Sequence, residues 1–475
     1  MTQLQASPLI IFISVRDLFG RRSYDIDIPT INGKPSRLLL LHGDNGSGKT
    51  TLLRLIWHTL SAAENKGHRS YLAKTPFSEL VIRMSDSRQI RVNKSEGLVG
   101  SFTVTLNRPG LEDSISTYEA NEDLTVRTPS IYGRLKRRDR DMFLQYTVRE
   151  SNLTQAGMMD LDAEMEAYNA SIRGEKEYLD FLATEVNTPL FLADDRSLYS
   201  DDPDINRMRE LLSRREDTER RDRLSRFVFI ELQVTMRRVN DYLRSLTLGG
   251  QNDGSANSNA IYMTVLRRLV QSPAGSLDSG DESQFLPIME LLDDIASISP
   301  GYEEFELVPK FDAKEFRALL ASANTPDIAE SAQRVIYPFL SSLRARYNAL
   351  KEAHDLLQTL IPSINNFLSE KNVVFTPQKG LRIVAIGGES LEVESLSSGE
   401  RQLLMLLCTT VLARIDTNVF IIDEPELSLG VEWQRNILDA VMQLTQDTNL
   451  QFLVATHSIE IISSRAESLA LLRQI

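Results

Sequence analysis

One segment near the start of the chain, "LHGDNGSGKTT" (41–51), has the spacing of a phosphate-binding loop. Its glycines and lysine fit the pattern G-x-x-x-x-G-K-[ST], in which uncovered backbone N–H groups cradle phosphate oxygens. An apolar run precedes the segment and a helical pattern follows it, which is the context this loop requires. We therefore predict a nucleoside triphosphate site formed by Gly43, Asn45, Gly46, Ser47, Gly48, Lys49, Thr50 and Thr51.

A second segment, "NVFIIDEPELSLG" (418–430), places two acids after an apolar run. Such a run predicts a buried parallel strand, and Asp423 and Glu424 follow at its carboxyl end, where α/β proteins bind ligands. Thr50 and Asp423 would hold Mg²⁺, and Lys49 would reach the β and γ phosphates. Glu424 would polarise the attacking water, a role worth about 10² to 10⁴ in rate. Paired acids can also be solvated turn residues, but a phosphate-binding loop needs such a partner.

A third apolar run, "LQFLVATHS" (450–458), ends at a histidine. A histidine that emerges from a buried strand beside two phosphate sites can donate a hydrogen bond to the γ-phosphate. We therefore add His457 to Lys49 and Glu424 as a catalytic residue, in preference to the alternative of a histidine in the core.

A fourth segment, "SLSSGERQLLMLL" (395–407), prepares an anion site without an anion of its own. Ser397, Ser398 and Gly399 bring hydroxyls and uncovered N–H groups to a helix start, where the helix dipole adds about half a positive charge. Glu400 follows in the first turn. The segment raises the question of which phosphate it holds.

Composition restricts the class of protein. The chain has 475 residues, of which 42% are apolar, so two or three domains with real cores are expected. No apolar run reaches the roughly 20 residues of a membrane helix, and we expect a cytoplasmic protein without membrane contact. The single cysteine, Cys408, excludes an internal disulfide and is expected in the core, and the five histidines lack zinc-ligand spacing.

The pattern of elements changes twice along the chain. Strand patterns dominate to about residue 130, interrupted by a helix over 50–60. A helical pattern then extends from about 155 to 368, and α/β alternation returns from 372. We therefore predict three parts: an N-terminal ATPase lobe over 1–150, a helical insertion over 151–370 with mobile loops near 249–260 and 271–284, and a C-terminal ATPase lobe over 371–475.

Apolar residues recur every seven positions between 336 and 368, in two series offset by four. This predicts a long amphipathic helix, either in a bundle or as a projecting coiled coil. Pro338 and Pro362 are expected to end or kink it, and His354 is expected to be a seam residue rather than a ligand.

Together, "GDNGSGKTT", "LSSGERQ", "IIDEPELSLG" and "ATHS", in this order, resemble the ATP-binding-cassette (ABC) ATPases, in the branch that holds Rad50, SMC, RecF and OLD-like proteins. The resemblance implies an α/β fold: a β-rich N-terminal lobe plus a RecA-like lobe, with a large helical, partly coiled-coil insertion. It also implies ATP and Mg²⁺ as cofactors, and a homodimer or higher homo-oligomer with ATP sandwiched between heads. Ser397 and Gly399 would then grip the ATP of a second copy.

Transport subunits fit less well. They commonly carry LSGGQ, where this chain has Ser398 and Glu400, and they lack so long an interval between Lys49 and Gly399. The chain resembles most the ATPase subunits of Septu and PARIS anti-phage systems. It departs from relatives at Gly430, where histidine is common, and only 18 residues follow His457, too few for the TOPRIM nuclease domain of OLD nucleases.

Several residues implied by the resemblance stay open. The glutamine that contacts Mg²⁺ could be Gln145 or Gln89, and the aromatic residue on adenine could be Phe19 or Tyr24. Arg196, in "NTPLFLADDRSLYS", resembles a residue near the nucleotide. The basic cluster Arg134–Arg140 is a candidate contact for nucleic acid, whereas the arginines between 207 and 226 alternate with acids, as on a solvated helix.

Three functions are consistent with these residues. The first is a regulatory ATPase of an anti-phage system that controls a separate nuclease or toxic effector. The second is a DNA repair or DNA-clamping ATPase of the RecF or SMC kind. The third is a scaffold held by nucleotide with negligible turnover, which the presence of Glu424 argues against.

Overall fold

The structure is a computed structural model that describes residues 8–64, 66–127, 155–201, 229–250, 286–321 and 326–474. The chain forms two compact units, one from Met1–Leu232 with Cys408–Ile475 and one from Gln233–Leu407. We describe each unit by itself. The division into three domains predicted from the sequence remains a proposal.

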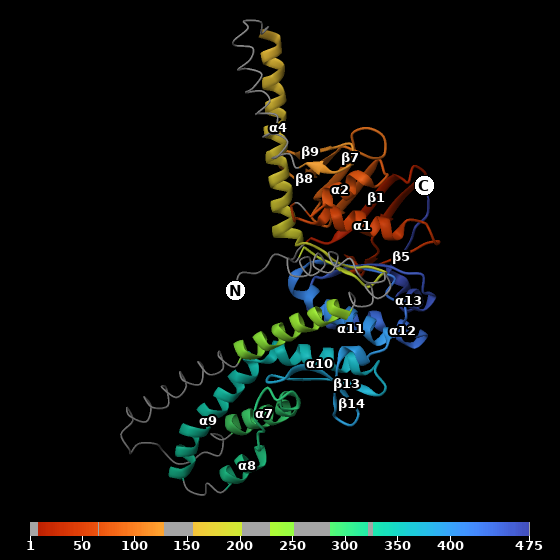
Figure 1. Cartoon of the computed structure of the whole chain (residues 1–475). Helices are drawn as coiled ribbons and strands as arrows, with labels where there is room; N and C mark the ends of the chain where they lie inside the picture. Colours follow the sequence, from red (N-terminus) through yellow and green to blue (C-terminus); the bar gives the residue numbers. More distant parts are fainter. Residues whose placement is uncertain are drawn as a thin grey trace. The chain divides into compact units, whose positions relative to one another are not determined.

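A seven-stranded antiparallel sheet forms one layer of the first unit (Figure 1). Its apolar positions alternate along the strands, as in β8, where Phe102, Val104 and Leu106 are fully buried. The long helix α4 (Gln155–Phe181) packs against β8 and β9. In spatial order the strands are β10 (Val126–Arg127), β9 (Ser114–Ala120), β8 (Phe102–Asn107), β7 (Gln89–Lys94), β6 (Glu79–Met84), β1 (Ile10–Leu18) and β2 (Arg22–Asp27).

A six-stranded, mainly parallel sheet forms the second layer of this unit and carries the candidate site. Its strands are continuous apolar runs, as expected for a sheet buried on both faces. Helix α1 (Lys49–Leu60) follows β5, and α12 (Val431–Leu444) follows β16. The spatial order is β12 (Leu198–Tyr199), β11 (Leu190–Leu192), β16 (Val419–Asp423), β17 (Gln451–Ala455), β5 (Leu38–His42) and β18 (Leu469–Leu471).

These two sheets confirm the predicted α/β class, but they correct some predicted elements. The helical character expected from 155 to 368 is wrong at β11 and β12, because a short apolar run there joins the parallel sheet beside β16. The helix α2 (His68–Lys74) also interrupts the N-terminal strands. The strand expected at "LEVES" is instead a two-residue strand, β15 (Ser390–Leu391), followed by a 3₁₀ turn.

The second unit is built from helices and a small antiparallel sheet. The helices are α7 (Leu286–Glu304), α8 (Ala313–Ala321), α9 (Pro326–Ala349) and α10 (Lys351–Asn365), and β13 (Lys371–Thr376) and β14 (Gly380–Ala385) pair beside β15. Residues 229–250 are helical too, mostly within this unit. The helix α11 (Ser398–Asp416) contributes residues to both units.

The heptad series lies on α9 and α10, but the helix is interrupted at a different residue from the two prolines that were predicted to end or kink it. Pro338 and Pro362 both lie inside helices, and the chain breaks at Leu350, which is fully buried. The seam is therefore two packed helices within a unit rather than one rod. His354 stacks on Tyr302 with ring centroids 3.9 Å apart, in agreement with a seam residue. Cys408 is fully buried, which raises its thiol pKa to about 12.

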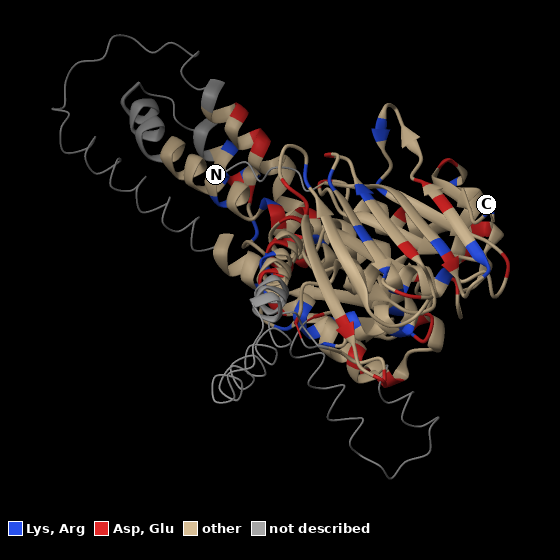
Figure 2. Cartoon of the chain, turned by 90° about the horizontal axis from the view of Figure 1, so that it is seen from above, with Lys and Arg blue, Asp and Glu red and all other residues tan. Residues whose placement is uncertain are grey.

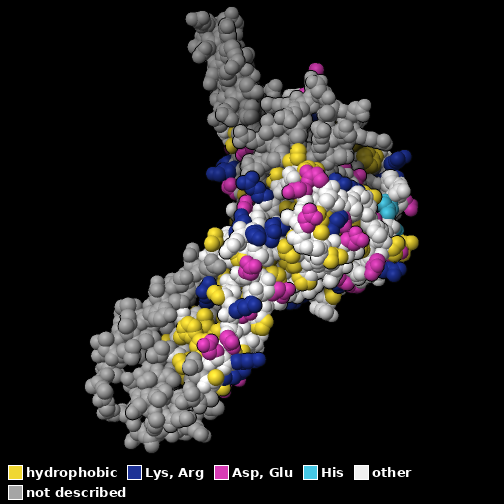
Figure 3. All heavy atoms as spheres, turned by 60° about the horizontal axis from the view of Figure 1, so that its bottom comes forward, with side chains coloured by type: hydrophobic (Ala, Val, Ile, Leu, Met, Phe, Trp, Pro, Cys, Tyr) yellow, Lys and Arg dark blue, Asp and Glu magenta, His cyan; other side chains and the backbone are white. Residues whose placement is uncertain are grey.

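Charges of both signs alternate over the described surface. Lys and Arg are interspersed with Asp and Glu on the strands of the large sheet (Figure 2), and the same mixture covers the face in Figure 3. The basic cluster Arg134–Arg140, the arginines between 207 and 226, and the loop at 271–284 lie outside the described residues, as does most of 249–260. Among the helices described, none is both long and apolar enough to span a bilayer.

Candidate functional site

The phosphate-binding loop joins β5 to α1, as predicted. Gly46 and Gly48 have φ values of 74° and 94°, a left-handed conformation that side chains disfavour. A Cβ atom on Gly48 would also lie 3.0 Å from Leu18 and 3.3 Å from the Phe19 ring. No side chain caps the start of α1. The loop therefore presents backbone N–H groups at a helix start, which is how proteins bind phosphate.

Lys49 is buried and already engaged within the loop. Its ammonium donates to the carbonyl oxygens of Gly43 and Asp44, at 2.9 and 3.3 Å, and lies 2.6 Å from Nε2 of His457. Burial lowers the pKa of Lys49, while the nearby carboxylates of Glu424, Asp423, Glu426 and Asp44 oppose the shift. Since a protonated lysine can only donate, Nε2 of His457 must accept, and the imidazole proton lies on Nδ1.

Asp423 is placed at the end of β16, with 1% of its surface exposed. Neither of its carboxylate oxygens has a hydrogen-bond partner of good geometry among the described residues. Burial raises its pKa to about 6; Thr50 and Arg54 act against the shift, and the charges of Asp194 and Glu424 add to it. A buried, unpartnered carboxylate beside a threonine hydroxyl is a donor set that Mg²⁺ prefers. Asp423 and Thr50 therefore fit the predicted metal site.

Glu424 has a positive φ of 49°, which is uncommon for a residue with a side chain. Its N–H donates to the carbonyl of Ala455, at 2.8 Å, which ties the end of β16 to the end of β17. The carboxylate lies 3.5 Å from Nε2 of His457, and both side chains are about three-tenths exposed. The structure thus brings Lys49, Asp423, Glu424 and His457 to one edge of the parallel sheet.

Glu426 is a site residue that the sequence analysis missed. One of its carboxylate oxygens, Oε1, accepts three hydrogen bonds, from the Thr456 hydroxyl at 2.8 Å, the His457 N–H at 2.6 Å and the Ser458 N–H at 3.0 Å. The other oxygen, Oε2, is buried without a hydrogen-bond partner among the described residues. Glu426 therefore fastens the turn that carries His457. The acidic run "DEPE" was the available signal, but only the meeting of β16 and β17 gives it this role.

Ser397 and Glu400 form a capping box at the start of α11. The Ser397 N–H donates to Oε2 of Glu400 at 2.6 Å, and the Glu400 N–H donates to the Ser397 hydroxyl at 3.3 Å. Lys371 pairs with the same carboxylate at 2.9 Å. Although burial acts to raise it, these partners hold the pKa of Glu400 below its usual value. Ser398 is exposed and takes no part in the box, so its N–H and hydroxyl and the Gly399 N–H are the groups left for an anion.

Arg196 lies in the turn that joins β11 to β12, at the edge of the parallel sheet. Its guanidinium donates to the Ser428 hydroxyl, in the segment after Glu426, and both residues have positive φ values, 69° and 67°. Gly430 caps α12 with a φ of −64°, and a Cβ atom there would meet nothing within 4 Å. The backbone at position 430 does not require glycine, so it does not explain why the histidine common in relatives is missing here.

Of the two aromatic residues that could contact adenine, the structure favours one. Tyr24 is buried, and its hydroxyl donates to the Ser47 carbonyl at 2.8 Å, which ties the loop to β2. Phe19 is 41% exposed beside Gly48, so it is the better placed to meet a base. Gln89 begins β7 within the antiparallel sheet, and Gln145 lies outside the described residues.

Comparison with known proteins adds a family to this geometry. Residues 22–462 match the family model described as the AAA ATPase domain. Over 126 residues, or 26% of the chain, the sequence is 25% identical to the lipoprotein-releasing system ATP-binding protein LolD of Syntrophus aciditrophicus (strain SB). This match spans about half, 55%, of that relative.

Solved structures of SMC heads are similar at low scores. One is the SMC head domain with an extended coiled coil bound to the C-terminal domain of ScpA from Pyrococcus furiosus, with 13% identity, a TM-score of 0.37, and coverage of 98% of this chain and 94% of that one. Another is the SMC head domain with a coiled coil and joint from Pyrococcus yayanosii, with 12% identity, the same TM-score, and coverage of 98% and 95%.

Proposed function

The chain belongs to the AAA ATPase domain family and is therefore an ATPase, and from this premise we propose that Lys49, Asp423, Glu424 and His457 form its hydrolytic site. The observation that carries the proposal is the position of the Lys49 ammonium. It lies 2.6 Å from His457 and within hydrogen-bonding distance of the loop carbonyls, in a unit where Asp423 is buried without a partner. No purely structural role needs these four groups together.

Each residue then has one task. Lys49 would exchange the carbonyls of Gly43 and Asp44 for phosphate oxygens. Thr50 and Asp423 would hold Mg²⁺, which would supply positive charge to the phosphates. Glu424 accepts the proton of the attacking water. His457, once Lys49 has turned toward phosphate, is free to contact the γ-phosphate. Asn45, Ser47 and Thr51 complete the loop around the phosphates, and Phe19 contacts the adenine.

We further propose an assembly in which two copies of the chain share each ATP. Support comes from the resemblance to ABC ATPases and from the capping box, which leaves Ser398 and Gly399 with donors at a helix start. Ser397 contributes by fixing that start, and Glu400 by closing the box. Each composite site would use Lys49 of one chain and Ser398 of the other, and a pair would hold two such sites.

A mixing experiment tests both proposals. Lys49→Ala removes the phosphate lysine, and Ser398→Arg fills the anion site with bulk without breaking the capping box, which Ser397→Arg would break. Each variant alone should hydrolyse no ATP, because every composite site in its homodimer is damaged. In a mixed pair both lesions fall in one site and the other is intact, so up to about half of the pairs formed should recover one working site.

The measurement is phosphate release after subunit exchange, which fluorescence transfer between labelled chains verifies. Recovered hydrolysis supports the shared site. If exchange is complete and the mixture stays inactive, the shared site is wrong. Ser398→Arg that hydrolyses ATP normally by itself would also contradict it, while leaving the site around Lys49 untouched. The matched control is Ser395→Arg, an exposed serine outside the capping box.

For the biological role we propose a regulatory ATPase of an anti-phage defence system that acts through a separate nuclease or toxic effector. This rests on the resemblance in "LSSGERQ" and "DEPELSLG". A DNA repair or DNA-clamping ATPase is the alternative, supported by the cluster Arg134–Arg140. Copurification of an effector that a neighbouring gene encodes would support the first role. Strong stimulation of ATP hydrolysis by DNA ends, without such a partner, would support the second.

A further inference from the structure

A cavity separate from the candidate ATP site lies in the first unit, on the side of α1 that faces α2, β11 and β12. Its volume is about 270 Å³, larger than the roughly 150 Å³ apolar cavity that accepts a benzene molecule. α1 supplies Arg54, Trp57 and His58 to the wall, so the helix that begins at Lys49 also borders this cavity. None of the residues assigned to ATP lines it.

Aromatic rings form most of the cavity wall. Trp57 and Tyr199 meet edge to face with centroids 5.5 Å apart, and Phe191 stacks near Tyr199 at 5.6 Å. Positive charge comes from the exposed Lys66 and from Arg54. The Arg54 guanidinium lies 6.0 Å from the centre of the Tyr199 ring and 4.0 Å from a carboxylate oxygen of Asp194. Flat apolar walls with cations at one side suit a planar aromatic anion.

A chain of hydrogen bonds fixes the polar wall. Asp201 lies 2.8 Å from Nε2 of His68, and Nδ1 of His68 lies 3.0 Å from Nδ1 of His58. An ionised carboxylate only accepts, so the His68 proton is on Nε2. When His68 carries this one proton, its Nδ1 accepts, and His58 must donate to it from Nδ1. Its Nε2 is left as an acceptor, with no hydrogen-bond partner among the described residues.

Asp201 and His58 are held firmly enough to define a site. The second oxygen of Asp201 accepts from the Ala63 N–H and the Thr188 hydroxyl, both at 3.1 Å, so both carboxylate oxygens have partners within the protein. The His58 ring stacks on Tyr71 with centroids 4.0 Å apart. Burial lowers the pKa of His58 to about 2, which keeps the ring neutral.

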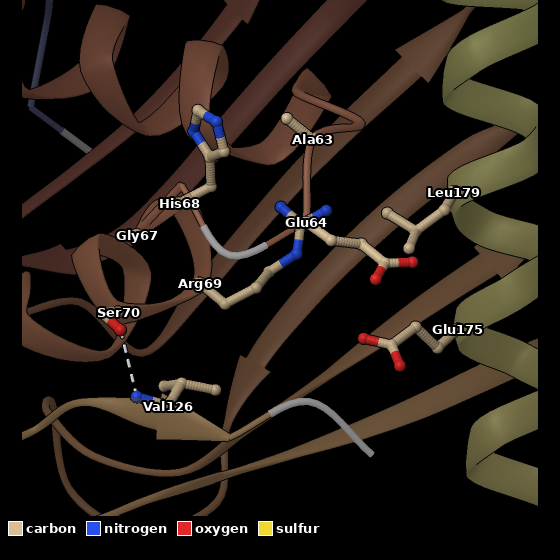
Figure 4. Close-up of a pocket in the computed structure, with 9 residues that line it drawn as sticks. All are labelled: Ala63, Glu64, Gly67, His68, Arg69, Ser70, Val126, Glu175 and Leu179. Atoms are coloured by element: carbon tan, nitrogen blue, oxygen red, sulfur yellow. Dashed lines mark hydrogen bonds between the residues drawn. The ribbon is translucent and has the colours of Figure 1, made fainter. Parts of the chain in front are cut away.

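The neighbouring cavity on the other side of His68 shows the contrast. Figure 4 shows Glu64, Arg69 and, from α4, Glu175 among the residues that line that pocket, and Ser70 hydrogen-bonded to Val126. Its volume is about 40 Å³, room for water but not for a ring. The packing around α2 is therefore tight on this side, and the large volume is particular to the cavity beside His58.

We propose that the larger cavity is a binding site for a planar aromatic ligand with a ring N–H and one anionic group. The N–H would donate to Nε2 of His58, the ring would lie among Trp57, Tyr199 and Phe191, and the anion would lie toward Arg54 and Lys66. A carboxylate and a phosphate would satisfy the same cations. The site uses none of the residues assigned to ATP, and its failure would leave the proposed function intact.

Calorimetry with the full chain at about pH 8, where free imidazole is neutral, tests the site with matched probes. Indole-3-acetate carries the ring N–H and a carboxylate, naphthalene-1-acetate lacks the N–H, and tryptamine carries a positive charge instead. We expect indole-3-acetate to bind at least about fivefold more tightly than naphthalene-1-acetate, the value of one hydrogen bond, and tryptamine not to bind. Indoxyl phosphate distinguishes a phosphate from a carboxylate ligand.

Two variants locate the binding. His58→Phe keeps the stacking on Tyr71 but removes the acceptor, and should make the two acetates bind equally. Lys66→Met should weaken both, whereas Lys74→Met, an exposed lysine of α2 outside the cavity, should change neither. Absence of indole-3-acetate binding up to about 1 mM overturns the proposal. So does tryptamine binding of equal strength, or discrimination that survives in His58→Phe. The wild-type comparison of probes stands even if a variant does not fold.

Discussion

Two helix starts in this molecule place serine and glycine before an apolar helix, and they prepare for an anion differently. At α1 the chain turns through left-handed glycines, Gly46 and Gly48, and no side chain caps the helix. At α11 the first N–H groups are partly satisfied by the capping box of Ser397 and Glu400. One start is left open for phosphate, and the other is stable without it.

The difference between the two helix N-termini indicates which of them requires a ligand. Around α1 lie a buried, unpartnered aspartate, which a cation would satisfy, and a buried lysine, which would exchange loop carbonyls for phosphate oxygens. Around α11 the charged groups, Lys371 and Glu400, already satisfy each other. Lesions in the first region should therefore cost activity, whereas lesions in the second should cost stability first.

The largest effect is expected from Glu424→Gln. The amide cannot accept the proton of the attacking water, so hydrolysis should fall by about 10² to 10⁴. ATP binding should persist, because Lys49 and the loop N–H groups are unchanged. Phosphate release and binding of a fluorescent ATP analogue measure the two quantities, and Glu432→Gln, on the exposed first turn of α12, is the matched control. Hydrolysis at the wild-type rate in Glu424→Gln would show that another group is the base.

A smaller loss is expected from Glu426→Ala, which acts through the turn rather than on the water. The hydroxyl of Thr456 and the N–H groups of His457 and Ser458 lose their shared acceptor, so His457 should move from its place beside Lys49. We expect turnover to fall about 10- to 100-fold and unfolding free energy by about 1 to 3 kcal/mol. Glu426→Gln keeps an acceptor oxygen and should restore most of the turnover. If Gln is as impaired as Ala, the carboxylate has a direct role instead.

The same contrast explains what could be predicted from the sequence. The loop, Asp423, Glu424 and His457 were predictable because each follows an apolar run at a fixed spacing, and parallel strands bring their carboxyl ends together. Glu426 follows no such spacing, and its three hydrogen bonds exist only because β16 and β17 are neighbours. The paired serines indicated an anion site, and the S-x-x-E spacing of Ser397 and Glu400 before an apolar run is itself the signature of the capping box that the structure shows.

The fold was predictable to a similar extent. Strands such as β8 were predictable as part of a β-rich region, because period-two apolar residues mark their buried faces. β11 was missed because three apolar residues cannot be told from part of a buried helix. At the heptad seam, both prolines were accommodated inside helices and the chain broke at Leu350, so packing outweighed local preference.

The smallest effect is expected from Glu400→Ala, which lowers stability first and affects ATP hydrolysis only through the start of α11. The variant loses the acceptor for the Ser397 N–H and the partner of Lys371, at a cost of about 1 kcal/mol in unfolding free energy. Because the pKa of Glu400 is lowered in the folded state, its contribution is complete above the usual value of 4.5 and disappears as the pH falls through the folded value. The difference between wild type and variant in urea unfolding should thus be full at neutral pH and shrink below about pH 4.5. Glu394→Ala, an exposed acid outside the box, should show neither the loss nor the pH dependence. A variant that keeps its stability but loses ATP binding would reverse the comparison and make the α11 start part of the chain's own nucleotide site.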